Sequence, residues 1–190
     1  LTARAGLLYQ NVVWSDMVQT AADLGAKEFH AQVCGDSKQS LKFAEQLYEI
    51  GQSAGIDCVV KIPLSLGGVR MVPNIKNLGG KILLTACYDA KQFVTAAALK
   101  ADYIAPYFGR MMEAGLDAMA HLKAMQRMSK NVKCRTLVAS LRDAQQIVEI
   151  AKLGHDCFTI SPSVAHDLFQ NDLTAVAVAN FEKSALGELL

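Results

Sequence analysis

Short runs of β-branched and apolar residues alternate along this chain with longer stretches that have the period of an amphipathic helix. Such alternation is typical of repeated strand–helix units, whose consecutive strands become parallel neighbours in one sheet. The candidate strands begin 22 to 30 residues apart, close to the roughly 30 residues of a minimal strand–helix–strand unit. The six candidates are residues 28–33, 58–64, 81–88, 103–108, 133–140 and 157–161.

The segments between these strands have the pattern of amphipathic helices, with apolar residues on one face. The clearest covers residues 37–54, with a cap at Asp36 and Ser37 and an end at Gly55. Others are expected at residues 13–24, 116–128, 144–153 and 163–169. Short loops and the absence of a Pro- or Ser-rich linker favour one closed or nearly closed α/β layer. The pattern alone also allows an open doubly wound sheet.

Counting strands favours an α/β fold of the (β/α)8 TIM-barrel class. A truncated strand ending near Leu1 and Thr2 would bring the count to seven, whereas this barrel needs eight. We therefore expect a first strand upstream of Leu1. Residues 1–171 would form the barrel domain lacking that strand. The C-terminal helix, in residues 172–190, carries more apolar surface than one barrel needs to cover, and we expect it to pack on a neighbouring subunit of a homo-oligomer.

The composition points to a small-molecule partner. A formal net charge of +1, with 52% apolar and 19% charged residues, gives no basic excess for nucleic acid or an anionic membrane. No apolar run reaches the roughly 18 residues of a membrane span. A charged-then-apolar leader is also lacking, so a soluble cytoplasmic protein is expected. The five cysteines are odd in number and form no CxxC pair, which favours reduced thiols.

We expect neither a metal nor a cofactor. His121, His155 and His166 share no spacing with one another or with a Cys or Asp partner. The chain also lacks the glycine-rich phosphate loops and the GxSxG nucleophile motif.

Lys61 is the most informative single residue because it interrupts an otherwise apolar strand. Lysine is almost never fully buried without a reason. Removing an ammonium from water favours the neutral amine, which is a nucleophile toward a carbonyl carbon. The strand context equally allows a structural alternative, in which Lys61 lies on the helix-facing side and its stem extends to solvent.

Further polar residues lie at the carboxyl ends of different candidate strands, where parallel barrels place their active sites. Each has a structural alternative, such as a bond to the backbone, a helix cap or an interface contact. Two arginines beyond strand ends could clamp a phosphate, or could be solvated surface residues. The strand-end residues are Gln32, Thr85, Tyr107 and Ser140, and the arginines are Arg110 and Arg142.

Several runs, taken in order, resemble the small transaldolase and fructose-6-phosphate aldolase family over essentially the whole chain. They are Phe29-His30-Ala31-Gln32-Val33, Val59-Val60-Lys61-Ile62-Pro63, Leu84-Thr85-Ala86-Cys87-Tyr88, Tyr103-Ile104-Ala105-Pro106-Tyr107-Phe108-Gly109-Arg110 and Leu137-Val138-Ala139-Ser140.

The resemblance implies a class I aldolase or transaldolase without a cofactor, acting on the C3–C4 bond of a ketose or its phosphate, with a dihydroxyacetone unit as donor. Lys61 matches the Schiff-base lysine. Gln32, Thr85 and Tyr107 match the residues that hold a catalytic water and move protons. Arg110 and Ser140 match the phosphate ligands. Glutamine and tyrosine at their two positions resemble the aldolase branch of the family.

Two departures concern the substrate. The family's asparagine after the second strand is replaced by Arg4 in Thr2-Ala3-Arg4-Ala5, and the first-strand aspartate lies in a region absent from this sequence. An inward-pointing Arg4 would favour a substrate with a carboxylate or second phosphate. The alternative to an enzyme is a non-catalytic barrel of the same family that binds a sugar phosphate or serves as a scaffold.

Overall fold

The computed structural model describes residues 8–187. A 3-10 turn, η2 (Tyr9–Asn11), precedes a series of strands and helices. The strands are β1 (Glu28–Gln32), β2 (Asp57–Pro63), β3 (Lys81–Cys87), β4 (Tyr103–Pro106) and β5 (Arg135–Thr136). The helices are α1 (Trp14–Asp23), α2 (Ser37–Ala54), α3 (Leu66–Lys76), α4 (Lys91–Ala98), α5 (Phe108–Glu113), α6 (Ala118–Ser129), α7 (Ala144–Ala151), α8 (Pro162–Asp167) and α9 (Asp172–Ala185).

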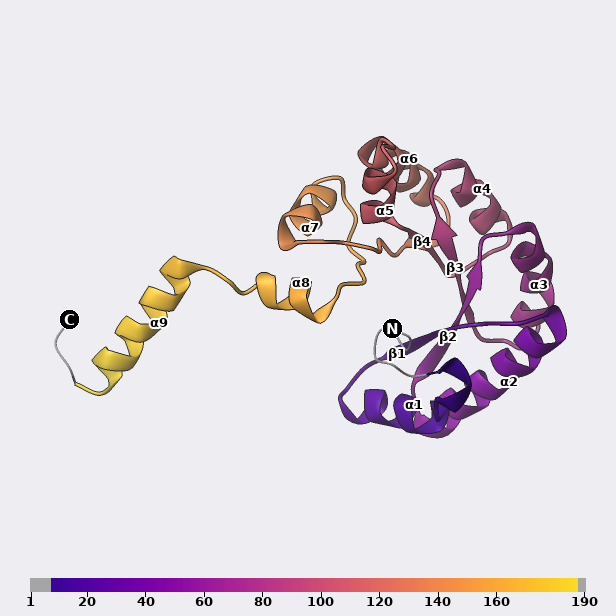
Figure 1. Cartoon of the computed structure of the whole chain (residues 1–190), viewed down its shortest axis with the longest axis horizontal. Helices are drawn as coiled ribbons and strands as arrows, with labels where there is room; N and C mark the ends of the chain where they lie inside the picture. Colours follow the sequence, from indigo (N-terminus) through magenta and orange to yellow (C-terminus); the bar gives the residue numbers. More distant parts are fainter. Residues whose placement is uncertain (1–7, 188–190) are drawn as a thin grey trace.

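The five strands form one parallel sheet in the order β1-β2-β3-β4-β5. The sheet is curved, and α2, α3, α4 and α6 cover its outer side (Figure 1). Parallel neighbours joined by helices in chain order are the arrangement of a (β/α)8 barrel. The predicted fold class is confirmed, and residues 8–187 form part of such a barrel.

The two faces of the sheet are separate hydrophobic layers, because successive side chains of a strand point to opposite sides. Outward-facing residues such as Val60, Leu84 and Ile104 pack against the helices in the main core. Inward-facing residues form a smaller cluster of Val59, Leu83, Tyr103, Ala105 and Ala139.

The strand register sets the height of each inward-facing residue. Gln32 pairs with Lys61, and Lys61 pairs with Leu83. Pro63, two residues further along β2, pairs with Thr85. Lys61 is therefore on the inner side of the sheet near its carboxyl edge, which contradicts the helix-facing alternative.

The prediction of a regular strand at residues 157–161 is wrong. Phe158 makes a single bridge to Val138, and Ser161 then caps α8, whose first residue is Pro162. A short extended run that pairs on one side through one bridge and leads directly into a helix cannot build a ladder. The strand expected to end near Leu1 and Thr2 lies outside the described residues.

The predicted strand at residues 133–140 is also shorter than expected. Regular pairing covers only Arg135–Thr136, and Ala139 forms an isolated bridge to Tyr107. Ser140 has a positive φ of 66°, which ends the extended conformation. The strand at residues 103–108 ends early for a similar reason, because α5 begins at Phe108.

The helix predicted at residues 37–54 is confirmed with the same bounds. Asp36 and Gln39 form a capping box, and Gly55 ends the helix in the left-handed conformation. The helix α3 was not predicted, because its first turn contains Gly67 and Gly68. A Cβ at position 68 would meet the carbonyl oxygen of Pro63, so the close approach of helix and strand requires glycine there.

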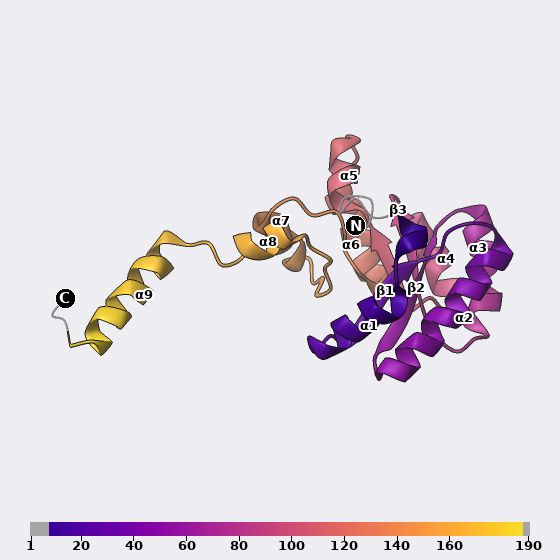
Figure 2. The ribbon, with the colours of Figure 1, turned by 60° about the horizontal axis from the view of Figure 1, so that its bottom comes forward.

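Helix α9 extends away from the curved sheet and its helices in both views of the molecule (Figures 1 and 2). None of its residues is buried, and the side chain of Phe181 is 71% exposed. No helix within residues 8–187 has the length and apolarity to cross a membrane.

Candidate active site

An open cavity of about 540 Å³ lies at the carboxyl ends of β2 and β4 and of the extended segment before α7. The predicted residues Lys61, Tyr107, Arg110, Ser140 and Arg142 all line it. The structure therefore brings five of the predicted site residues to one place, from segments up to 81 residues apart in the sequence. Parallel strands end at the same edge of a sheet, and this shared edge explains the convergence.

Lys61 reaches the cavity from the inner face of β2. Its flanking residues Val60 and Ile62 are fully buried on the other face. Burial removes water from the ammonium and lowers the pKa of Lys61 below its ordinary value. No acidic neighbour among the described residues offsets this shift. The neutral, nucleophilic amine is therefore more populated near pH 7 than it is for a surface lysine.

Tyr107 and Thr85 form a hydroxyl pair beside Lys61. The two oxygens are 2.8 Å apart, and Thr85 is only 1% exposed. Tyr88 packs edge-on against the ring of Tyr107, with ring centroids 5.6 Å apart. The guanidinium carbon of Arg110 lies 5.0 Å from the centre of the same ring. These contacts hold the phenol in one orientation at the mouth of the cavity.

The cationic side of the cavity is built by Arg110 and Arg142. Arg110 also donates to the hydroxyl of Tyr88 at 3.4 Å. Arg142 donates from Nε and Nη2 to Oε1 of Glu113, at 3.0 and 2.7 Å. Because Glu113 accepts both bonds at the solvent-exposed side, Arg142 is held beside the cavity in a fixed direction.

Ser140 lines the same cavity and has a strained backbone, with a φ of 66°. The amide of Gly109 donates to the carbonyl oxygen of Ser140 at 3.0 Å, which ties the first turn of α5 to this segment. A Cβ at position 109 would meet that carbonyl, so only glycine permits the approach.

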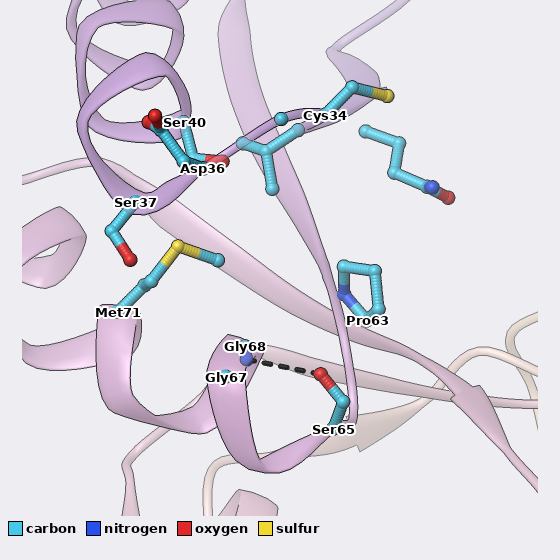
Figure 3. A pocket seen from close by; sticks show the side chains of 12 residues that line it. Cys34, Asp36, Ser37, Ser40, Pro63, Ser65, Gly67, Gly68 and Met71 are labelled. Atoms are coloured by element: carbon cyan, nitrogen blue, oxygen red, sulfur yellow. Dashed lines mark hydrogen bonds between the residues drawn. The ribbon is translucent and has the colours of Figure 1, made fainter.

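Gln32 does not line this cavity, although it is the register partner of Lys61. Gln32 lines a second cavity of about 550 Å³, between the first turns of α2 and α3. Figure 3 shows its wall, with Ser37 and Ser40 on one side and Gly68 donating to Ser65 Oγ at 3.1 Å on the other. The structure does not place Gln32 in the Lys61 cavity. Arg4 lies outside the described residues.

Some residues of the site were not found from the sequence. Tyr88, Glu113 and Thr159 each contact the cavity or a residue that lines it. The signal for Tyr88 was its place just after a strand that already carried Thr85. No sequence signal pointed to Glu113, because its contact with Arg142 joins residues that are 29 positions apart. Within residues 8–187, no group of three His, Cys, Asp or Glu side chains could hold a metal ion.

The fold, together with the residues at the carboxyl edge of the sheet, indicates the class of protein. A parallel strand–helix barrel with a half-buried lysine, a tyrosine and arginines at the carboxyl ends of its strands has the layout of a barrel enzyme's active site. Solved structures share this fold. A variant of flavocytochrome b2 superposes with a TM-score of 0.59 at 12% identity, over 78% of this chain and 45% of that one. The PaMucR phosphodiesterase superposes with a TM-score of 0.56 at 10% identity, over 83% and 76%.

The sequence comparison is more specific. The model of the family described as Transaldolase/Fructose-6-phosphate aldolase matches residues 3–188, and the chain belongs to this family. A probable transaldolase of Anaeromyxobacter sp. (strain K) is 35% identical over 129 residues, which are 67% of this chain and 59% of that protein. A probable transaldolase of Sulfurihydrogenibium sp. (strain YO3AOP1) is 29% identical over 174 residues, covering 90% and 78%. The chain spans about 60% of the length of several such relatives.

Proposed function

We propose that the protein is a Schiff-base aldolase or transaldolase that breaks or forms the C3–C4 bond of a ketose phosphate. Membership of the family and its probable transaldolases supports this class of activity. The observation that carries the proposal is Lys61, a half-buried amine whose pKa is lowered by burial, on the wall of the cavity at the carboxyl ends of the strands. The proposed catalyst is therefore an amine poised for attack on a carbonyl.

The chemistry can be assigned to residues of this chain. The amine of Lys61 attacks the C2 carbonyl, and loss of water gives an iminium. The C3–C4 bond then breaks, its electron pair moves into the iminium to form an enamine, and the C4 hydroxyl releases its proton as the aldehyde forms. Tyr107 relays that proton: its hydroxyl takes it up while giving its own proton to a water beside Thr85, and the proton returns when the enamine is protonated. Transfer to a second aldehyde, or protonation and hydrolysis, frees Lys61.

The phosphate of the substrate would lie against Arg110, Ser140 and Arg142, polar residues that line the same cavity as Lys61. A guanidinium donates to phosphate oxygens through a planar fork, which matches this role. Arg4, if it points inward, would add a further positive charge for a carboxylate or second phosphate.

Replacement of Arg110 by glutamine should weaken the use of phosphorylated ketoses. Hydrogen bonds to charged groups contribute roughly 1.5–3 kcal/mol, so we expect kcat/KM for a ketose phosphate to fall about tenfold to a hundredfold. The value for the unphosphorylated ketose should change little. Arg127→Gln, which removes an exposed arginine of α6, is the matched control. An equal loss for both substrates in Arg110→Gln would remove the phosphate role.

The proposed function is tested by trapping. Borohydride added with dihydroxyacetone or fructose 6-phosphate should fix one adduct per chain and abolish activity. The absence of an adduct with any ketose would instead support the non-catalytic, sugar-phosphate-binding or scaffold barrel.

We also propose that α9 packs on a neighbouring subunit. It carries Leu173, Val176 and Phe181 exposed on a helix that contacts little of its own chain. Such apolar surface is costly in water and is typical of an interface.

Removal of residues 172–190 should therefore change the state of assembly. Sedimentation at micromolar concentration is expected to give an oligomer for the longer protein and smaller species for the shortened one. Replacing Phe181 and Leu173 by serine should have the same effect without a truncation, whereas Thr174→Ser should not. A monomer in every case would contradict the proposal.

A further inference from the structure

A cluster of charged side chains lies on the inner face of the sheet, toward the amino ends of the strands, and the proposed chemistry does not use it. Nζ of Lys81 bonds to the carboxylates of Glu28 and Asp57, the latter at 2.7 Å. The hydroxyl of Tyr103 donates to both oxygens of Glu28, at 3.0 and 2.9 Å. His30 is bonded to Oε2 of Glu28 at 3.1 Å. The three groups bonded to Glu28 come from three different strands, with His30 on β1, Lys81 on β3 and Tyr103 on β4.

The register brings this cluster close to Lys61. Lys61 pairs with Leu83, and Lys81 lies two residues earlier on the same strand, so both lysines face the same side. Strand spacing and rise put their Cα atoms about 8 Å apart. His30 has the same relation to Lys61 across β1 and β2, because it pairs with Val59.

His30 links the cluster to Lys61 in space, because it is bonded to Glu28 and lies two residues before Gln32, the register partner of Lys61. Burial lowers the pKa of His30, Glu28 acts in the opposite direction, and both Lys61 and Lys81 lower the pKa further. The imidazole thus lies within range of both ammonium groups. Other titratable or charged groups that face Lys61 are Glu28 on β1, Asp57 on β2, Tyr103 on β4, Tyr107 after β4, Arg110 on α5 and Arg142 before α7.

We propose that Lys81 is a positioning residue, which acts on Lys61 through its charge. Its ammonium offsets the carboxylates of Glu28 and Asp57, so that these two anions do not hold a proton on Lys61. The inference rests on the proposed role of Lys61 as the attacking amine.

The balance of charge explains why the cluster needs a lysine. Two carboxylates on the inner face would favour the ammonium form of any nearby amine. The hydrogen bonds that Lys81 donates to the carboxylates of Asp57 and Glu28 raise the pKa of Lys81, so Lys81 stays charged over the working range of pH. Two neighbouring lysines thereby have opposite tasks: Lys81 is the permanent cation, and Lys61 is the amine that loses its proton.

The proposal predicts shifts of defined sign in the pH profile of adduct formation at Lys61 with dihydroxyacetone and borohydride. Lys81→Gln should move the midpoint upward, and Glu28→Gln should move it downward. Two unit charges roughly 8 to 12 Å apart at an effective dielectric constant of about 20 give a shift on the order of one pH unit. The rate near pH 7 should fall about tenfold in Lys81→Gln, since each unit is a factor of ten.

Combined variants separate charge from structure. The double variant Glu28→Gln with Lys81→Gln should return the midpoint to its original value, and Lys81→Arg should leave it there. Lys76→Gln, which breaks the ion pair with Asp102 outside the barrel interior, is the control and should cause no shift. A purely structural role for Lys81 would not be rescued by removal of a second side chain. Unchanged midpoints in both single variants would overturn the inference.

A second readout needs no ketose. The rate of Lys61 acetylation by acetic anhydride, followed by peptide mass spectrometry against pH, reports the free amine directly. It should show the same upward and downward shifts. If the protein forms no adduct but these shifts appear, the proposed function fails and the coupling between Lys81 and Lys61 stands. If adducts form but acetylation is unaffected by either variant, the coupling fails and the proposed function stands.

Discussion

Lys61→Arg is expected to give no borohydride-stable adduct with any ketose and to lower kcat/KM by roughly 10⁴-fold or more, the scale on which loss of a covalent nucleophile acts. Arginine keeps the positive charge and much of the length of the side chain, but a guanidinium cannot serve as the attacking amine. The measurement is the mass of the peptide that contains residue 61 after borohydride treatment, together with steady-state activity. Lys61→Met should behave in the same way and shows that charge is not the missing element.

The specificity of the adduct is as informative as its presence. Lys91, on α4, has a side chain that is 82% exposed, and Lys91→Arg should keep both adduct and activity. Lys81 is engaged by two carboxylates and should not be modified. If the added mass is on Lys81 or Lys91 instead of Lys61, the enzyme hypothesis in this form is wrong.

Tyr107→Phe is expected to produce the second largest effect, a loss of about 10² to 10⁴ in kcat, the usual contribution of general acid–base catalysis. The variant removes only the hydroxyl that lies 2.8 Å from Thr85, so the ring should keep its contacts with Tyr88 and Arg110. Initial formation of the iminium should be affected less than bond cleavage. Single-turnover kinetics, with trapping of the iminium and separate measurement of the released aldehyde, distinguish these steps.

Two companion variants complete this test. Thr85→Val leaves the Tyr107 hydroxyl without its partner and should lower kcat by a smaller factor. Tyr48→Phe is the control. It removes a hydroxyl that donates to the carbonyl of Lys81 on the outer side of the sheet, and kcat should stay close to that of the original protein. Similar losses in Tyr48→Phe and Tyr107→Phe would indicate a general loss of structure, and the proton-transfer role of Tyr107 would then be withdrawn.

Local patterns made much of the fold predictable. The apolar run around Lys61 is a strand because β-branched residues suit a sheet that is buried on both faces. The cap at Asp36 and the glycine at 55 fixed the longest helix for equally local reasons. Tertiary contacts decided the rest. Gly68 lies within a helix because α3 must approach the carbonyl of Pro63, and a reading of the sequence places a Gly-Gly pair in a loop.

The site was partly predictable for the same reason. Residues at the ends of parallel strands must meet at one edge, so Lys61, Tyr107 and Ser140 could be grouped in advance. Gln32 satisfies the same rule and pairs with Lys61, yet it lines a different cavity, which is completed by the first turns of α2 and α3. The ion pairs of Lys81 join residues far apart in the chain, and no local motif indicates them.

The backbone at Ser140 carries a consequence for stability. A φ of 66° is unfavourable for any residue with a Cβ, and of order 1–3 kcal/mol is lost when such a position is not glycine. Glycine at 140 would relieve that strain at once. A serine there gives up folding free energy in exchange for a hydroxyl group at the cavity. If Ser140 binds the phosphate as proposed, thermostability and turnover are expected to conflict at position 140, because selection for stability would favour glycine and remove the hydroxyl.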